Sequence, residues 1–356
     1  MRILYVGPEL GTSRHRLAAL RRLGHDVTVV DSYKALEKFG LPRALLARWI
    51  FKAGAFGLGG TVRRYVLSQV KDAAFDLVFV DSGELLGPAT IKALKKIGGI
   101  VVNYNPDNPY VSRDGLKWRR FLTALPFYDL VATPRASSVA PASRAGARRV
   151  IAVNFAADEA VHRPIELNGE DRARYAAKVV FVGTWMPERG PFLLRLVERG
   201  VPLRIYGARW SFAPEYEKLR ACVASGDLSG DDYVKAIRGA EIAIGLLSKG
   251  NEDLHTTRSL EIPAIGTLLC AERTSDHLAM YEDGGEAIFF DSADECADLC
   301  LALLAQPDRI AKIAAAGSKR VRRNCDFNET LLSKIIDAAL AMQRNQPETA
   351  NGLVGS

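Results

Sequence analysis

Residues 2–30 read RILYVGPELGTSRHRLAALRRLGHDVTVV. The apolar run 2–6, followed by a glycine-rich turn, predicts a buried strand that enters a loop. Leucines at helical spacing between Arg14 and Leu23 predict a helix, and Gly24 is a suitable C-cap. The run 26–30 predicts a second strand. A strand, a helix and a second strand in this order are the repeating unit of a parallel sheet.

The same alternation continues along most of the chain. Short, continuously apolar runs of this kind are typical of parallel strands buried on both faces. We predict further strands at 76–80, 99–102, 128–132, 149–153, 179–183, 203–207, 240–244, 266–270 and 287–290, and helices at 88–97 and 328–343. No strand is expected between 156 and 177. The pattern predicts an α/β fold of two Rossmann-like, doubly wound domains facing an interdomain cleft.

Length and composition agree with two domains. The chain has 356 residues, of which 48% are hydrophobic and 25% charged, and its formal net charge is +7. These values exclude a disordered chain, a collagen and a small disulfide scaffold. The longest apolar runs are far shorter than the ~20 residues of a membrane span. Because the N-terminal residues enter a strand pattern directly, we expect no signal peptide and a cytoplasmic protein.

The expected boundaries follow from these patterns. We predict an N-terminal domain at 1–155, an interdomain connection at 156–177, a C-terminal domain at 178–325, a last helix within 326–345 and a disordered tail at 346–356. The chain has five cysteines and no Cys-x-x-Cys pair. Cys296 and Cys300 are four residues apart without a nearby histidine, so we expect thiols without a metal.

In each predicted domain, one glycine-containing loop follows the first strand. Gly11, Thr12 and Ser13 open the first helix, where backbone N–H groups attract phosphate or carboxylate. His15 lies just behind them. The spacing does not fit the dinucleotide fingerprint, and a tight strand-to-helix turn is the alternative.

In the second domain the corresponding loop contains Gly183, Thr184 and Arg189. Its glycine permits close approach of a ligand, and its arginine can bind a diphosphate. The alternative is a surface loop with a solvated arginine.

The most informative stretch lies between Lys249 and Gly266. Thr256 or Thr257 is a suitable N-cap for a helix that contains Glu261 in its first turn. A carboxylate there can accept both hydroxyls of a ribose, while the helix N-terminus and Arg258 hold phosphates. The alternative is a well-capped helix with a surface glutamate.

Two polar loops follow strands of the first domain. Asp107, in the loop Asn103–Tyr110, can bind an acceptor hydroxyl or act as a base, although Asn-Pro-Asp is also common turn chemistry. For Asp81 and Ser82, helix capping is at least as good an explanation as catalysis.

Several stretches resemble one family. FVGTWMPERG (181–190), DLHTTRSLEIPAIGTLLCAERT (253–274) and YEDGGEAIFFDSADECADLCLALLAQPDRIAKIAAAGSKRV (281–321) resemble the glycosyltransferases related to the spore-maturation protein CgeB, and NPDNP (105–109) is similar to a loop of that family. The family belongs to the wider superfamily of GT-B fold. The resemblance implies a nucleotide-sugar donor held by the second domain and a C-terminal helix that crosses back to the first.

The resemblance also implies roles for single residues. Glu261 matches the glutamate that binds ribose hydroxyls, and Arg189 and Arg258 match basic positions near the diphosphate. Asp253 stands eight residues before Glu261, where many retaining relatives have a glutamate. No metal and no cofactor are implied, because basic side chains and helix N-termini neutralise the leaving diphosphate.

The expected function is therefore transfer of a sugar from a UDP- or GDP-type donor, with UDP favoured, to an acceptor hydroxyl of a glycan, protein or small molecule. A retaining reaction needs no dedicated base, whereas an inverting one would use Asp107 or His15. Two alternatives are a GT-B-fold sugar-nucleotide epimerase and a non-catalytic nucleotide-sugar binding protein. No nucleic-acid partner is expected.

Residues 33–71 form a segment that a minimal fold of this type does not need. Residues 33–71 carry eight Lys or Arg residues against Glu37, interleaved with apolar residues such as Trp49 and Phe51. Such a basic amphipathic segment can lie peripherally on an anionic membrane. A helical insertion beside the acceptor site is the interpretation we favour.

Overall fold

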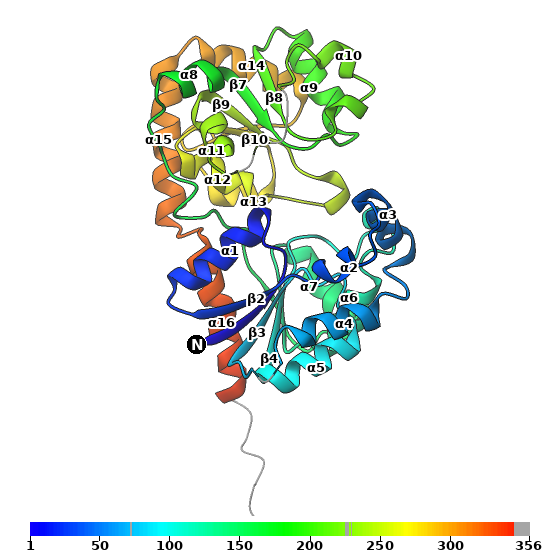
Figure 1. The fold of residues 1–356 in the computed structure, drawn as a ribbon. Coiled ribbons are helices and arrows are strands. Elements are labelled where there is room, and N and C mark those ends of the chain that lie inside the picture. Colours follow the sequence, from blue (N-terminus) through cyan, green and yellow to red (C-terminus); the bar gives the residue numbers. More distant parts are fainter. Residues whose placement is uncertain (72, 225–227, 229, 345–356) are drawn as a thin grey trace, which may run out of the picture. The chain divides into compact units, whose positions relative to one another are not determined.

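The computed structural model describes residues 1–71, 73–224, 228 and 230–344, apart from the side chains of residues 43 and 343. The chain divides into two compact units (Figure 1). The first comprises Met1–Asn154 and the chain from Glu329 onward, and the second is Phe155–Asn328. The division places the expected connection, 156–177, inside the second unit, where a helix, α8 (Gly169–Tyr175), forms. The tail predicted at 346–356 lies outside the described residues.

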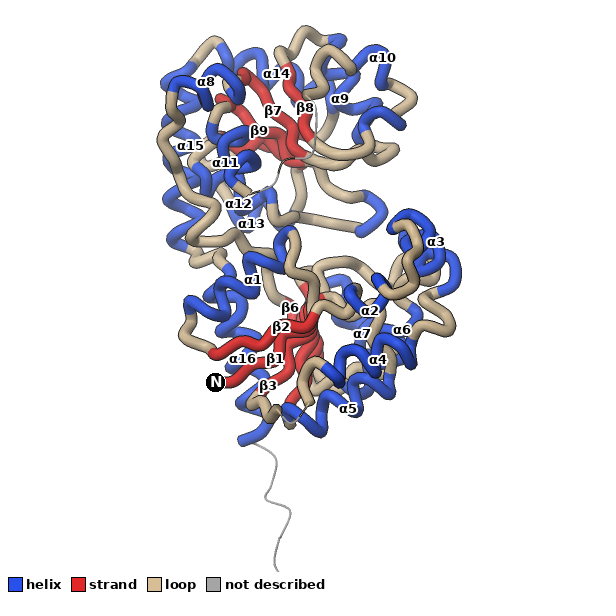
Figure 2. Tube along the Cα trace, in the orientation of Figure 1, coloured by secondary structure: helices blue, strands red, loops and turns tan. Residues whose placement is uncertain are grey.

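The first unit contains a six-stranded parallel sheet with the order β2-β1-β3-β4-β5-β6 (Figure 2). The chain moves from β1 outward to β2, then returns to the other side of β1 to form β3. The topological switch point is therefore between β1 and β3. The strands are β1 (Arg2–Val6), β2 (Asp26–Val30), β3 (Leu77–Asp81), β4 (Ile100–Tyr104), β5 (Leu130–Thr133) and β6 (Val150–Ala152).

Helices connect these strands and cover the sheet. They are α1 (Gly11–Arg22), α2 (Lys34–Glu37), α3 (Arg43–Ala53), α4 (Gly59–Ser68), α5 (Pro88–Gly98), α6 (Arg119–Ala124), α7 (Val139–Arg144) and α16 (Asn328–Arg344). The basic segment 33–71 is thus mainly helical. In α16, Leu332, Ile335, Ile336 and Ala339 are buried at helical spacing, so one apolar face anchors the helix.

The second unit contains a five-stranded parallel sheet with the order β11-β10-β9-β7-β8. Its switch point is between β7 and β9. The strands are β7 (Ala177–Val182), β8 (Leu203–Tyr206), β9 (Ala240–Gly245), β10 (Leu268–Glu272) and β11 (Ile288–Phe290). The other helices are α9 (Arg189–Glu198), α10 (Tyr216–Leu219), α11 (Asp231–Arg238), α12 (Arg258–Ile265), α13 (Ser275–Met280), α14 (Ala293–Leu304) and α15 (Pro307–Arg323).

All eleven strands predicted from the sequence are present, with ends displaced by two residues at most. In the second sheet, alternate side chains of β7 enter separate cores. Val179 and Phe181 pack with Leu193 of α9, whereas Val180 packs in the cluster that contains Leu260 of α12. Burial on both faces explains why these strands are continuously apolar rather than alternating.

A close backbone approach joins the ends of β7 and β8. Gly207, directly after β8, has a φ of +137°, and a Cβ there would lie 2.2 Å from the Gly183 carbonyl oxygen. Neither the dihedral angle nor the space suits another residue. This contact fixes the loop after β7 against the loop after β8.

We therefore predict that Gly207→Ala lowers the free energy of unfolding by at least about 2 kcal/mol, because it combines backbone strain with a steric clash. Urea denaturation of the full chain measures the change. Gly169→Ala is the matched control, since Gly169 has no neighbour within 4 Å and its φ is not positive. Equal stability of the two variants would contradict the prediction.

Candidate functional site

Two arginines lie at the switch point of the second unit. Arg189, the first residue of α9, donates from Nη1 to the Thr184 carbonyl (2.9 Å) and from Nη2 to the Leu246 carbonyl (3.4 Å). Arg258, the first residue of α12, donates from Nε to the Val182 carbonyl (2.6 Å). The accepting carbonyls belong to the last residue of β7 or to residues just after β7 and β9. Backbone contacts therefore hold both guanidinium groups at the carboxyl ends of these strands, where ligands of parallel sheets bind.

The electrostatics of this pair favour an anion. Arg189 is only 7% exposed, its guanidinium lies 5.6 Å from the Phe181 ring centroid, and its Nε has no hydrogen-bond partner. Burial, followed by the positive charge of Arg258, lowers the pKa of Arg189 to about 10. Within the described part of the chain, no carboxylate lies within 4.0 Å of either guanidinium group. A buried cation without a counter-ion is unfavourable, so a bound anion would stabilise this arrangement.

The loop after β7 is shaped around Arg189. A Cβ on Gly183 would lie 2.7 Å from the Phe181 ring and 3.3 Å from Arg189 Nη1. Packing against Phe181 and Arg189 therefore requires glycine here. Because Arg189 is buried and bonded to Thr184, the solvated surface arginine considered above is wrong.

The start of α12 differs from the sequence expectation. Thr257 occupies the N-cap position, but its side chain makes no capping hydrogen bond. The Thr256 N–H donates instead to Ser259 Oγ (3.1 Å), and the Thr257 carbonyl accepts from Glu261 N (2.8 Å). Side-chain capping by Thr256 or Thr257 is therefore wrong, because their backbone carbonyls, not their hydroxyls, accept the hydrogen bonds of the N–H groups of Ser259, Leu260 and Glu261.

Glu261 is 4% exposed, so the alternative of a surface glutamate is also wrong. Its Oε2 accepts a hydrogen bond from the Tyr233 hydroxyl of α11. Burial, followed by the charge of Glu261, raises the pKa of Tyr233 well above its ordinary value, so Tyr233 remains a donor. His162 Nε2 lies 3.8 Å from Glu261 Oε1. Neither Tyr233 nor His162 was selected from the sequence.

Contacts with α13 hold the N-terminal end of α12 in place. His277 bonds through Nε2 to Ser259 Oγ (2.7 Å) and through Nδ1 to the Glu272 carbonyl (2.6 Å). Burial lowers the pKa of His277, which favours the neutral ring. Asp253, in the preceding loop, is buried, and its charge favours the protonated form of Arg189.

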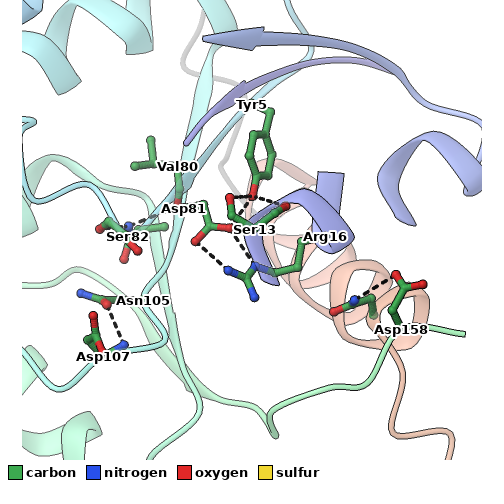
Figure 3. Close-up of polar contacts among 11 residues, drawn as sticks. Tyr5, Ser13, Arg16, Val80, Asp81, Ser82, Asn105, Asp107 and Asp158 are labelled. Atoms are coloured by element: carbon green, nitrogen blue, oxygen red, sulfur yellow. Dashed lines mark hydrogen bonds and ion pairs between the residues drawn. The ribbon is translucent and has the colours of Figure 1, made fainter. Parts of the chain in front are cut away.

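The switch point of the first unit also contains an arginine, but this one is paired. Arg16 of α1 donates to Asp81 at the end of β3 through Nε (2.7 Å) and Nη2 (3.1 Å), and both side chains are at most 5% exposed (Figure 3). The Tyr5 hydroxyl also donates to Asp81 and lies 2.7 Å from Ser13 Oγ. Capping by Asp81 is wrong, because its carboxylate is committed to this network.

The predicted phosphate loop lies beside that network. Gly11 is exposed, Thr12 and His15 are partly buried, and Ser13 is buried against Tyr5. All four belong to α1, which begins at Gly11.

Asp107 lies in a turn after β4. Its N–H donates to Asn105 Oδ1 (3.0 Å), as turn chemistry predicts (Figure 3). Its carboxylate lies 3.5 Å from Arg113 and 3.6 Å from Lys117 and is about one-third exposed. The buried Nδ2 of Asn105 has no hydrogen-bond partner. This loop therefore combines an accessible carboxylate with an unused donor.

Comparisons with known proteins agree on the second unit. Residues 189–332 match a family model described as glycosyl transferase-like. Over these residues the chain carries a glycosyl transferase-like domain. The match begins at Arg189 and includes Arg258 and Glu261. No curated protein matches the chain.

Solved structures resemble the whole fold. Sucrose-phosphate synthase from Thermosynechococcus elongatus has a TM-score of 0.68 at 12% identity, over 97% of this chain and 100% of its own. Anabaena HepE in complex with UDP and glucose has a TM-score of 0.67 at 13% identity, over 96% and 100%. An E. coli structure described as trehalose-6-phosphate bound with UDP-2-fluoro glucose has a TM-score of 0.62 at 12% identity, over 95% and 99%. At these identities the likeness shows the GT-B fold.

The glycosyltransferase domain also contains a group of three thiols. Cys270 of β10 joins Cys296 and Cys300 of α14, and the three sulfur atoms lie within 4.8 Å of one another. All three are fully buried in the apolar core around Ile244 and Leu303. Thiolates are ligands for soft metal ions. Among the described residues no further His, Cys, Asp or Glu joins this group, and hydrogen bonds between the thiols raise the pKa of Cys270 and lower that of Cys300.

We predict that Asp81→Asn destabilises the first unit by about 3–5 kcal/mol, because it leaves the buried charge of Arg16 without a counter-ion. Urea denaturation measures the loss. Glu329→Gln is the control, since it removes the partner of Arg22 in a partly exposed ion pair and should cost less than about 1 kcal/mol. A similar cost for both variants would show that the Arg16–Asp81 pair contributes no more than a surface pair.

Proposed function

We propose that the chain transfers a sugar from a nucleoside diphosphate sugar, with UDP as the preferred nucleotide, to an acceptor hydroxyl. The proposal rests on Arg189 and Arg258, which backbone carbonyls hold at the switch point of the second unit. Among the described residues, no carboxylate lies within 4.0 Å of either guanidinium group. The UDP and UDP-sugar complexes of the structural neighbours support this choice of nucleotide. We assign the chain to the CgeB-related branch on the three sequence stretches quoted above.

The chemistry follows from where charge develops. As the bond between the sugar's anomeric carbon and the diphosphate oxygen breaks, negative charge grows on the β-phosphate. Backbone carbonyls already orient Arg189 and Arg258, and Arg189 is also buried, so the pair stabilises this charge with little reorganisation. The same preorganised charge neutralises the leaving group without a metal ion or a further cofactor. We assign Gly183 and Thr184, in the loop that accepts a hydrogen bond from Arg189, to contacts with the diphosphate.

The nucleoside is assigned to the start of α12. Glu261 Oε1, the oxygen opposite the one held by Tyr233, accepts a ribose hydroxyl. Thr256 and Thr257 precede the first turn and offer polar contacts to the phosphates. Asp253 lies in the same loop, and we assign it to the donor sugar.

Acceptor binding is assigned to the first unit. Gly11, Thr12 and Ser13 form the start of α1, and Asp107 provides an accessible carboxylate. We favour retention of configuration, in which no dedicated base is needed. Asp107 or His15 is the base if the reaction inverts.

We predict that a panel of UDP- and GDP-sugars will contain one donor from which the enzyme slowly releases nucleoside diphosphate and free sugar when water replaces the acceptor. Arg189→Met and Arg258→Met should each lower this rate on the order of 10²–10³-fold, because each removes a preorganised donor. Arg309→Met is the control, since Arg309 is an exposed residue of the same domain. Product analysis by chromatography measures the rates.

Each alternative has its own product pattern. An interconverted sugar nucleotide without free diphosphate identifies an epimerase. Tight nucleotide binding without any product, also in the presence of acceptor mixtures, identifies a binding protein. Unchanged rates in both arginine variants would refute the assignment of the diphosphate site.

We also predict that the enzyme binds UDP more tightly than 2′-deoxy-UDP, and that Glu261→Gln removes most of this preference. A charged acceptor contributes more to a hydroxyl hydrogen bond than a neutral amide, so the preference should fall about tenfold. Isothermal titration measures both ligands on both proteins. Tyr233→Phe is the control, because it removes the contact on Oε2 and leaves Oε1 charged. Equal preference in the wild type and in Glu261→Gln would place the ribose elsewhere.

A further inference from the structure

The basic charge of the chain is concentrated in one segment of the first unit. Between residues 33 and 71 eight basic side chains stand against Glu37, an excess that equals the net charge of +7 of the whole chain. Acidic and basic residues elsewhere therefore balance. The basic residues are Lys34, Lys38, Arg43, Arg48, Lys52, Arg63, Arg64 and Lys71. Those whose side chains are described are all exposed.

The same segment exposes large apolar side chains. Phe39, Leu41, Leu45, Phe51 and Phe56 are between 39% and 75% exposed, with Phe56 the highest. An isolated exposed leucine needs no explanation, but five large apolar residues within eighteen positions form a concentration.

Helix α3 shows how the two kinds of residue are combined. Its inner face carries Ile50, buried in the core of the first unit, with Leu46 and Trp49 packed against that core. At 3.6 residues per turn, Leu45, Arg48, Phe51 and Lys52 point outward within a sector of about 120°. The outer face therefore alternates apolar and basic side chains instead of being uniformly polar, as it is on most surface helices.

Neighbouring loops extend this surface. Phe56 follows α3 in the loop before α4, and Leu116, which is 46% exposed, bonds through its N–H to the Phe51 carbonyl (2.8 Å). We call the surface formed by Leu45, Arg48, Phe51, Lys52, Phe56 and Leu116 the basic–apolar face. Its residues lie on α3, which Figure 1 labels, and in two loops of the first unit.

We propose that the basic–apolar face binds peripherally to the surface of an anionic lipid bilayer. Phenylalanine and leucine side chains enter the boundary between headgroups and acyl chains, while the arginine and lysine head groups remain at the level of the lipid phosphates. Charge complementarity favours an anionic leaflet. No helix among the described residues is long and apolar enough to cross a membrane, so the binding is superficial.

Co-sedimentation of the full chain with vesicles tests this inference. We expect binding to vesicles of equal parts phosphatidylglycerol and phosphatidylcholine, and much weaker binding to phosphatidylcholine alone. Phe51→Ser combined with Phe56→Ser, and Arg48→Gln combined with Lys52→Gln, should each weaken partitioning about tenfold or more. Phe212→Ser and Arg309→Gln are matched controls on exposed residues of the second unit, and Phe212 is 73% exposed.

A second readout separates insertion from adhesion. Phe56→Trp should give additional fluorescence that shifts to the blue and is protected from acrylamide when anionic vesicles are added. Because the substituted side chains are exposed, their melting temperatures should match the wild type.

Three outcomes would overturn the proposal. The first is no binding to anionic vesicles at low salt, and the second is an equal loss in the control variants. The third is retention on immobilised poly-glutamate, lost in both double variants, without vesicle binding. This last result would assign the face to an acidic protein instead.

Discussion

The switch point of a parallel sheet is the constraint on which this structure depends. Where the chain leaves two adjacent strands in opposite directions, their loops separate and leave backbone groups and helix N-termini without neighbours. The protein places an arginine at both of its switch points. In the first unit Asp81 neutralises Arg16, whereas in the second unit Arg189 and Arg258 bond to carbonyl oxygens, and no carboxylate of the described residues lies within 4.0 Å of them. The first is a structural ion pair, and the second has the charge distribution of an anion site.

This difference has an energetic consequence. The lowered pKa of Arg189 means that the folded protein stabilises its charge less well than water does. The unfavourable charge persists because the rest of the domain fixes it: Phe181 packs beneath the guanidinium, Gly183 leaves it room, and His277 holds the start of α12. Under the proposed function, the diphosphate of the donor would supply a counter-charge to this arginine. The stability of the apolar cores thus holds the arginine in place, and this is the preorganisation that electrostatic catalysis requires in the proposed function.

The sequence predicted the strands because burial on both faces leaves a local trace, a continuous apolar run. It also indicated Arg189, Arg258 and Glu261, because they follow strands and begin helices. The partners of the buried charged residues were not predictable. Tyr233 is 28 positions from Glu261, and Asp81 is 65 positions from Arg16, and no local periodicity connects such pairs.

Errors arose where local chemistry competed with tertiary contacts. Asp81 and Thr257 are both residue types that commonly cap helices, yet Asp81 pairs with Arg16, and Thr257 accepts from the helix through its backbone carbonyl instead of its hydroxyl. Structural neighbours at 12–13% identity, over at least 96% of the chain, share the fold although few residues are the same. Such likeness survives because apolar pattern and volume, rather than particular residues, specify the two sheets. The polar loops at the strand ends are free to diverge under the same scaffold, so chemistry must be argued from their side chains.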